Sequence, residues 1–148
     1  LIPASFVPQF QTPTDKSKTP RPVQNHQATL SGEVLIVEDN IIIAMDAEDI
    51  LKEFGASAVT VVSSVSGALT AIGEKAFSFA LLDINLGVET SEPVAQALME
   101  KNVSFAFATG YGDSSELTKK FKGVAVIQKP YEKSAIANAL ASLKQRQI

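Results

Sequence analysis

Residues 79–87, Phe-Ala-Leu-Leu-Asp-Ile-Asn-Leu-Gly, decide the fold. Four apolar residues run without interruption into Asp83, a pattern typical of a strand covered on both faces in a parallel sheet. A carboxylate is costly to bury in mid-strand, so we place Asp83 at the strand's carboxyl end, the edge where open parallel sheets bind ligands. The stretch therefore predicts a parallel sheet with Asp83 as its reactive centre, although a residue that caps the next turn would give the same pattern.

The composition is that of a globular domain in an aqueous compartment. The chain has 148 residues, of which 45% are hydrophobic, a net charge of -3 and no cysteine. The small negative charge gives no case for binding nucleic acid or an anionic membrane. The absence of cysteine excludes disulfides and thiolate metal sites, and no apolar run approaches the roughly 18 residues of a membrane helix. We expect a cytoplasmic protein whose partners are neither nucleic acid nor membrane.

The N-terminal part of the chain differs from the rest. Residues 1–10 are apolar and interrupted by prolines, and we interpret them as the tail of a preceding domain. Residues 11–29 carry three prolines among polar side chains, which is typical of a flexible linker. Residues 30–148 are expected to form the folded domain.

From residue 30 onward, five apolar runs alternate with five segments of helical periodicity. The predicted strands cover residues 33–37, 59–62, 79–83, 105–108 and 124–127. The predicted helices cover about 43–54, 66–75, 93–101 and 113–121, followed by a last helix after Pro130. We expect the core to receive Ala68, Leu69 and Ile72 from the second helix, and Ile136, Ala139, Leu140 and Leu143 from the last. Apolar strands with short connections predict an α/β fold, a doubly wound five-stranded parallel sheet with helices on both faces.

Polar residues follow four of these five strands. Glu38 and Asp39 come after the first strand, Asp83 ends the third, Thr109 follows the fourth and Lys129 the fifth. The carboxyl ends of parallel strands share one edge, so these side chains should converge. Three carboxylates repel one another unless a cation intervenes, and hard oxygen ligands suit Mg²⁺. A carboxylate nucleophile, a divalent metal, a lysine and a hydroxyl are the parts needed to take up a phosphoryl group.

Each part also has a purely structural interpretation. Glu38 and Asp39 could cap a helix, Thr109 could be ordinary strand-end chemistry, and Lys129 with Pro130 could start a helix. Their joint placement, in order and on matching strand ends, favours the phosphoryl site. There is no glycine-rich phosphate loop, so nucleotide binding lacks its main support.

Over about residues 32–147, these features resemble the receiver domain of two-component response regulators. The resemblance implies a flavodoxin-like fold with strand order 2-1-3-4-5. It implies that Asp83 accepts a phosphoryl group from a histidine kinase or a histidine phosphotransfer protein. It assigns Thr109 as the switch hydroxyl and Lys129 as the phosphate-contacting lysine, with a cis bond before Pro130. It assigns the ligands of Mg²⁺, or of Mn²⁺ in its place, to Glu38, Asp39, Asp83 and the main-chain carbonyl of Asn85.

A narrower motif lies at the fourth strand. Residues 104–112, Ser-Phe-Ala-Phe-Ala-Thr-Gly-Tyr-Gly, resemble the "FAT GUY" receivers found chiefly in alphaproteobacteria. Gly87 fits this subgroup, whereas Ser104 and Glu92 depart from it. Most receivers carry an aromatic residue at the position of Val126, and its ring turns inward on activation. Valine has no ring, so this motion is not available here. We expect Thr109, Gly110 and Tyr111 to act as the switch instead.

The wider context remains open at the level of sequence. The linker favours the C-terminal receiver of a hybrid histidine kinase over a stand-alone receiver, and we expect no output domain after the last helix. Lys119, Lys120 and Lys122 are more typical of a solvated face than of a docking site. A Mg²⁺-dependent phosphohydrolase is disfavoured because Asn85 stands where such enzymes usually carry a second aspartate. A pseudo-receiver, a binding module without phosphorylation, is disfavoured because the acidic residues and the lysine are all present.

Overall fold

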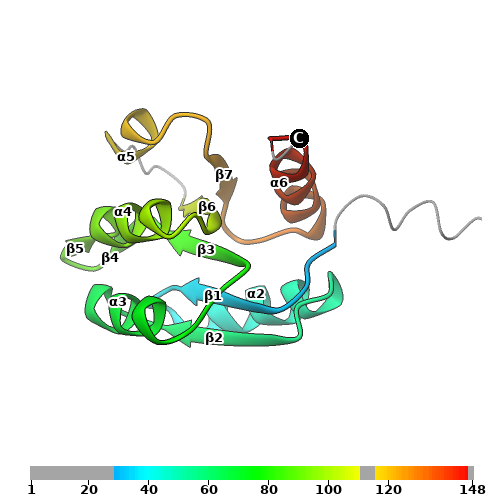
Figure 1. The fold of residues 1–148 in the computed structure, drawn as a ribbon, viewed down its shortest axis with the longest axis horizontal. Helices are drawn as coiled ribbons and strands as arrows, with labels where there is room; N and C mark the ends of the chain where they lie inside the picture. Colours follow the sequence, from blue (N-terminus) through cyan, green and yellow to red (C-terminus); the bar gives the residue numbers. More distant parts are fainter. Residues whose placement is uncertain (1–28, 111–115, 147–148) are drawn as a thin grey trace, which may run out of the picture.

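Figure 1 shows the computed structural model of the chain, which describes residues 29–110 and 116–146, the last three by their backbone only. Five parallel strands form one sheet in the order β2-β1-β3-β6-β7. They comprise β1 (Glu33–Val37), β2 (Ala58–Val62), β3 (Phe79–Asp83), β6 (Ser104–Thr109) and β7 (Ala125–Gln128). Numbered among themselves, these strands have the predicted order 2-1-3-4-5, so the predicted flavodoxin-like architecture is confirmed.

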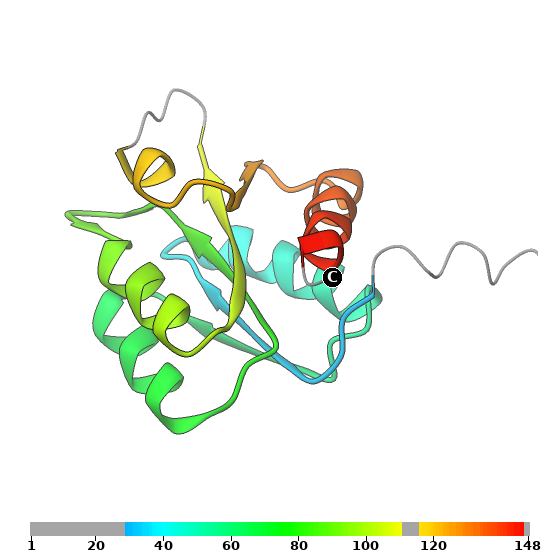
Figure 2. The ribbon, with the colours of Figure 1, turned by 45° about the horizontal axis from the view of Figure 1, so that its top comes forward.

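Both faces of the sheet are apolar, because alternate side chains of each strand point to opposite sides. Val34 and Ile36 pack on the face covered by α2 (Ile41–Glu53) and α6 (Lys133–Arg146). Leu35 and Val37 pack on the other face, whose core also takes side chains from the remaining helices, α3 (Val65–Glu74), α4 (Glu92–Glu100) and α5 (Glu116–Lys120). Figure 2 shows the sheet between these two layers. Every residue of the central strand β3 is buried, as the uninterrupted apolar run predicted.

The first helix is bounded by local chemistry. The Asn40 side chain accepts hydrogen bonds from the backbone N–H groups of Ile42 and Ile43, at 3.0 and 3.2 Å, and so caps the start of α2. Gly55 follows the end of the helix with a φ of +116°. A Cβ at that position would overlap the carbonyl oxygen of Leu30, so this turn requires glycine. Leu30 is held there because its N–H donates to the carbonyl of Phe54.

Two local predictions need correction. In α3 the core receives Ala71 with Ala68 and Ile72, whereas Leu69 is 40% exposed, because a helix buries residues at spacings of three and four. A short antiparallel hairpin, β4 (Asn85–Leu86) with β5 (Glu89–Thr90), lies in the connection after β3 and was not predicted. Two-residue strands are too short to leave a periodic pattern in the sequence.

The remaining expectations for helices agree with the structure where it describes them. The inner stripe of α6, Ile136, Ala139, Leu140 and Leu143, is buried as predicted. Part of the predicted fourth helix, residues 113–115, lies outside the described residues. No helix of the described segments has the length and apolar character that crossing a membrane requires.

Candidate functional site

The predicted site residues lie together at the carboxyl edge of the sheet. Glu38 and Asp39 follow β1, Asp83 is the last residue of β3, Thr109 ends β6, and Lys129 follows β7. These four strands are neighbours in the sheet, so their ends are adjacent. We call this group of residues the carboxyl-edge site.

Lys129 joins the two buried carboxylates of this site. Its ammonium lies 3.0 Å from Oδ2 of Asp83 and 3.2 Å from Oε1 of Glu38. The lysine side chain is only 14% exposed, and both carboxylates are buried. The backbone also fixes this residue, because the N–H of Lys129 donates to the carbonyl of Thr109 at 2.8 Å. Lys129 therefore pairs with two buried carboxylates at once.

The pKa values of these residues reflect the presence of two buried carboxylates beside one lysine. Burial raises the pKa of Glu38 to about 7, against the hydrogen bond from the Asn40 N–H, and the charge of Asp83 raises it further. Burial also raises the pKa of Asp83, against the hydrogen bond and charge of Lys129. Burial alone would lower the pKa of Lys129, but its two carboxylate partners raise it overall. The site thus holds more negative charge than its own lysine balances.

The donor set fits a hard divalent cation. Glu38, Asp39 and Asp83 each offer a carboxylate oxygen, and these three oxygens lie within 4.8 Å of one another. Asp39 is exposed and, with Glu38, borders a cavity of about 550 Å³, so the cluster is reached from solvent. All three donors are oxygens, which suits Mg²⁺ or Mn²⁺. A divalent ion here would also offset the excess negative charge.

Asn85 takes part through its backbone. Its N–H donates to Oδ1 of Asp83 at 3.3 Å, while its side chain is exposed. The oxygens of Asp83 are thus held by Asn85 on one side and by Lys129 on the other. The role of the Asn85 carbonyl as a metal ligand stays a prediction.

The geometry also decides between the alternative interpretations of two motifs. Asn40, not Glu38 or Asp39, caps α2, and Oε2 of Glu38 instead accepts the N–H of Asn40 at 3.0 Å. The Lys129–Pro130 bond is cis, as predicted, and α6 begins only at Lys133. Pro130 is therefore not the first residue of a helix.

The proposed switch is described only in part. The hydroxyl of Thr109 donates to the carbonyl of Gly110 at 3.3 Å, and Tyr111 lies outside the described residues. Val126 is paired in register with Phe107 of β6 and is exposed. These positions leave the assignment of Thr109, Gly110 and Tyr111 as a switch a prediction.

One residue near the site, Tyr131, and one buried residue in the connection after β3, Ser91, were missed by sequence reasoning. Burial raises the pKa of Tyr131, and the neighbouring carboxylates of Glu38 and Asp83 raise it further, so its phenol lies near the acidic cluster. Its position directly after Lys129 and Pro130 was the available signal. Ser91 is buried, and its N–H and hydroxyl both donate to the carbonyl of Ile84, at 3.2 and 3.3 Å, which closes the connection after β3. No sequence pattern marks that serine.

Comparison with known proteins gives the family. Neither a family model nor a curated protein matches the chain. The solution structure of SdrG from Sphingomonas melonis Fr1 matches with 39% identity and a TM-score of 0.66, over 76% of this chain and 96% of that one. The BeF3-activated conformation of SdrG, from Pseudomonas melonis Fr1, matches with 39% identity and a TM-score of 0.60, over 75% and 94% of the two chains.

A third structure supports the same fold. The CheY-like response regulator receiver domain from Methylobacillus flagellatus matches with 22% identity and a TM-score of 0.65, over 77% of this chain and 99% of that one. Receiver domains bind Mg²⁺ at an acidic pocket and interact with kinases or other signalling proteins, and the described residues of this chain include an acidic group, Glu38, Asp39 and Asp83. By its similarity to SdrG and by its fold, the chain belongs to the response regulator receiver family of two-component signalling.

Proposed function

We propose that this receiver takes a phosphoryl group onto Asp83 from a histidine kinase or a histidine phosphotransfer protein, with Mg²⁺ or Mn²⁺ bound. One observation carries the proposal: the Asp83 carboxylate lies between Lys129 and the N–H of Asn85, beside two further carboxylates at an edge open to solvent. In the transfer, a bond forms between an Asp83 oxygen and phosphorus. The bond from phosphorus to the donor's imidazole nitrogen breaks, and that nitrogen keeps the electron pair.

Each residue of the carboxyl-edge site has its own role in the proposed transfer. The N–H of Asn85 and the ammonium of Lys129 orient the Asp83 carboxylate before transfer. Lys129 can then contact the incoming phosphoryl oxygens, and Thr109 adds a hydroxyl donor at the end of the neighbouring strand. Asp39, Glu38, Asp83 and the Asn85 carbonyl would hold the divalent ion, which neutralises charge on the transferring group. The phosphohydrolase alternative is weaker, since the neutral amide of Asn85 cannot act as a general acid.

The finer features of the family resemblance belong to the same proposal. The residues of 104–112 favour the FAT GUY subgroup, with Thr109, Gly110 and Tyr111 as the switch in place of an aromatic flip. The existence of a BeF3-activated conformation of SdrG supports an activated state in a relative that is 39% identical. We retain the hybrid-kinase context as a hypothesis that follows from the composition of residues 1–10 and 11–29.

A mass measurement tests the phosphoacceptor. Incubation with acetyl phosphate and Mg²⁺ should add one phosphoryl group to the chain, and chelation of the metal should prevent it. Asp83→Asn should not gain the adduct, whereas the matched control Asp49→Asn, an exposed carboxylate on α2, should gain it normally. An adduct of equal yield on Asp83→Asn would contradict the proposal. Steady turnover of small phosphate esters by the unmodified chain would favour the phosphohydrolase instead.

A further inference from the structure

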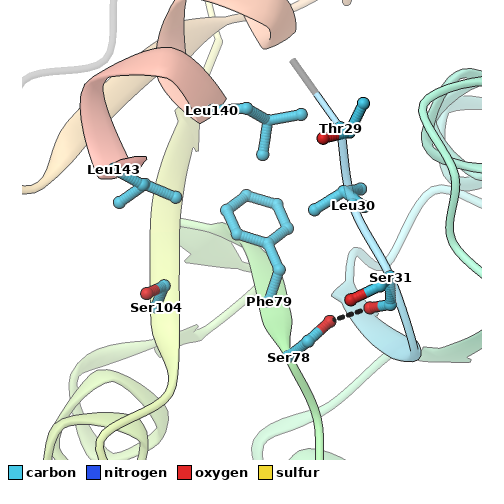
Figure 3. Close-up of a pocket in the computed structure, with 8 residues that line it drawn as sticks. All are labelled: Thr29, Leu30, Ser31, Ser78, Phe79, Ser104, Leu140 and Leu143. Atoms are coloured by element: carbon cyan, nitrogen blue, oxygen red, sulfur yellow. Dashed lines mark hydrogen bonds between the residues drawn. The ribbon is translucent and has the colours of Figure 1, made fainter. Parts of the chain in front are cut away.

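The large apolar side chains that remain exposed are not spread evenly over the described residues. Seven of them are at least 40% exposed. Four of these seven belong to the first turns of α2 or to the turn of the β4–β5 hairpin: Ile41, Ile42, Met45 and Val88. The hollow where the strands begin offers no comparable surface, because Phe79, Leu140 and Leu143, which line it in Figure 3, are already buried.

The start of α2 places three of these side chains beside the acidic cluster. Ile41, Ile42 and Met45 are 62%, 65% and 54% exposed. Ile41 borders the same cavity of about 550 Å³ as Glu38 and Asp39. Met45 lies four residues after Ile41 and three after Ile42, so it continues their surface by one helical turn. The carboxyl-edge site is thus bordered by exposed apolar side chains of α2.

The β4–β5 hairpin brings a fourth apolar side chain to the same site. The hairpin begins two residues after Asp83, and its two-residue turn consists of Gly87 and Val88. Gly87 has a φ of +75°, and a Cβ at that position would lie 4.0 Å from Oδ2 of Asp39. Val88 is completely exposed. Figure 1 shows this hairpin beyond the carboxyl ends of β1 and β3. We call the four exposed side chains the apolar rim: Ile41, Ile42, Met45 and Val88.

Both elements of the apolar rim also carry negative charge. Asp46 directly follows Met45, Glu89 directly follows Val88, and both carboxylates are exposed. Residues 38–49 and 85–92 contain neither lysine nor arginine. A small anionic phosphodonor gains nothing from an apolar and acidic surface. A protein that carries apolar side chains and cations around its phosphohistidine matches both properties.

We propose that the apolar rim is the surface on which the protein phosphodonor docks, with Val88 of the hairpin as a contact residue beside those of α2. This inference rests on the proposed function, because a donor imidazole that reaches Asp83 brings its own surface against the rim. The donor presents apolar side chains to the rim and lysine or arginine to Asp46 and Glu89. A second copy of this chain matches less well, since an isologous contact would bring identical acidic surfaces together.

Phosphotransfer kinetics test the proposal on the full chain. The histidine kinases and histidine phosphotransfer proteins encoded in the same genome are loaded with radiolabelled phosphate from ATP, and kcat/KM for transfer to the chain is measured for each. Val88→Lys and Met45→Lys should each lower kcat/KM for the best protein donor by at least about tenfold, because they replace an apolar contact with a charge of the donor's own sign. The rate of phosphorylation by acetyl phosphate should remain that of the unmodified chain.

Two further variants control for non-specific effects. Val88→Leu keeps an apolar side chain at the hairpin turn and should keep the transfer from the protein donor. Met99→Lys makes the same change of charge at a position on α4 that is 52% exposed and lies outside the apolar rim. It should accept the phosphoryl group from the protein donor as the unmodified chain does.

Several outcomes would overturn the proposal. Unchanged transfer to Val88→Lys and Met45→Lys, or transfer from no protein donor while acetyl phosphate still reacts, would show that the rim does not receive a donor. An equal loss of the reaction with acetyl phosphate would assign these residues to the chemistry instead of to docking. A dimer of the unmodified chain in sedimentation that Val88→Lys abolishes would assign the rim to a second copy. The absence of any phosphoryl adduct on the unmodified chain, from every donor, would instead overturn the proposed function itself.

Discussion

The two edges of the sheet are built from different chemistry. At the carboxyl edge, Glu38 and Asp83 are the buried charged side chains of the described residues, and Lys129 lies between them. At the amino edge, where the strands begin, the residues that precede β1 and β3 include small side chains with neutral hydroxyls, among them Ser31 and Ser78. The fold therefore concentrates its buried charge at one edge, where the proposed phosphoryl chemistry needs it, whereas the ion pair of Glu33 with Lys75 at the other edge is partly exposed. Each of the following experiments can break or sharpen this comparison.

We expect the largest effect from Lys129→Met. Removing the cation that pairs with two buried carboxylates should lower the free energy of unfolding by about 2–3 kcal/mol. This is somewhat below the usual cost of breaking a buried pair, because the carboxylates can take up a proton. Urea unfolding at pH 8 without divalent metal measures this change. The matched control is Lys133→Met, whose ion pair with Glu53 is exposed at 62% and 55% and should be worth less than about 1 kcal/mol. Equal losses in the two variants would contradict a special role for the carboxyl edge.

Asp39→Ala should come next in size, through metal affinity. Loss of an outer-shell partner typically weakens a metal site by about 10–100-fold, so loss of a direct oxygen ligand should cost at least tenfold in Mg²⁺ affinity. Isothermal titration calorimetry measures the change directly. Asp46→Ala, an exposed carboxylate on α2, is the control and should bind Mg²⁺ like the unmodified chain. Unchanged affinity in Asp39→Ala would remove this residue from the proposed metal site.

The free energy of unfolding should depend on pH because of the buried carboxylates at the carboxyl edge. Glu38 has a pKa of about 7 in the folded chain, against an ordinary value of 4.5, so the folded state binds more protons than the unfolded state between these pH values. The free energy of unfolding of the metal-free protein should therefore fall as pH rises from about 4.5 through 7. The raised pKa of Asp83 acts in the same direction.

Thermal melts at several pH values with a chelator measure this slope. Glu38→Gln, which cannot titrate, should make the fall in Tm across the window smaller. The control is Glu48→Gln, a half-buried carboxylate on α2 that pairs with Lys52. Added Mg²⁺ should raise Tm more at pH 8 than at pH 5. At pH 8 Glu38 has lost its proton, and the bound cation then offsets the negative charge of the carboxylate. A Tm that falls as steeply in Glu38→Gln as in the unmodified chain would show that Glu38 is not the group responsible.

The smallest effect is expected from the amino edge itself. Ser78→Ala removes a hydroxyl that donates to the carbonyl of Ser31, at an exposed position, and should cost about 0.5–1 kcal/mol or less. The same urea unfolding experiment measures it, and phosphorylation by acetyl phosphate should be unchanged. If Ser78→Ala lowered the free energy of unfolding as much as Lys129→Met, the amino edge would contribute as much to stability as the buried charges do.

The sequence predicts most of the residues that the structure brings together at the carboxyl-edge site. Asp83 was identified because an apolar strand runs into it, and Glu38, Asp39, Thr109 and Lys129 because they follow other strands. Tyr131 could not be assigned in this way, since its role depends on the approach of its phenol to Glu38. Leu69 was placed in the core by its character, whereas the packing of α3 buries Ala71 in its place. Local patterns identify which elements form, and less reliably which face of each one is covered.

The sequence by itself determined the order of the five strands in the main sheet and of the helices that follow them, because periodicity and strand-end chemistry are properties of neighbouring residues. Only the tertiary structure decided how distant residues affect one another. Lys129 is 46 residues from Asp83 and 91 from Glu38 along the chain, yet it hydrogen-bonds to both. The raised pKa of Glu38 and the hollow where the strands begin likewise come from parts of several strands and helices brought together. Burial and Coulomb interactions depend on these distances in space, which chain position alone does not specify.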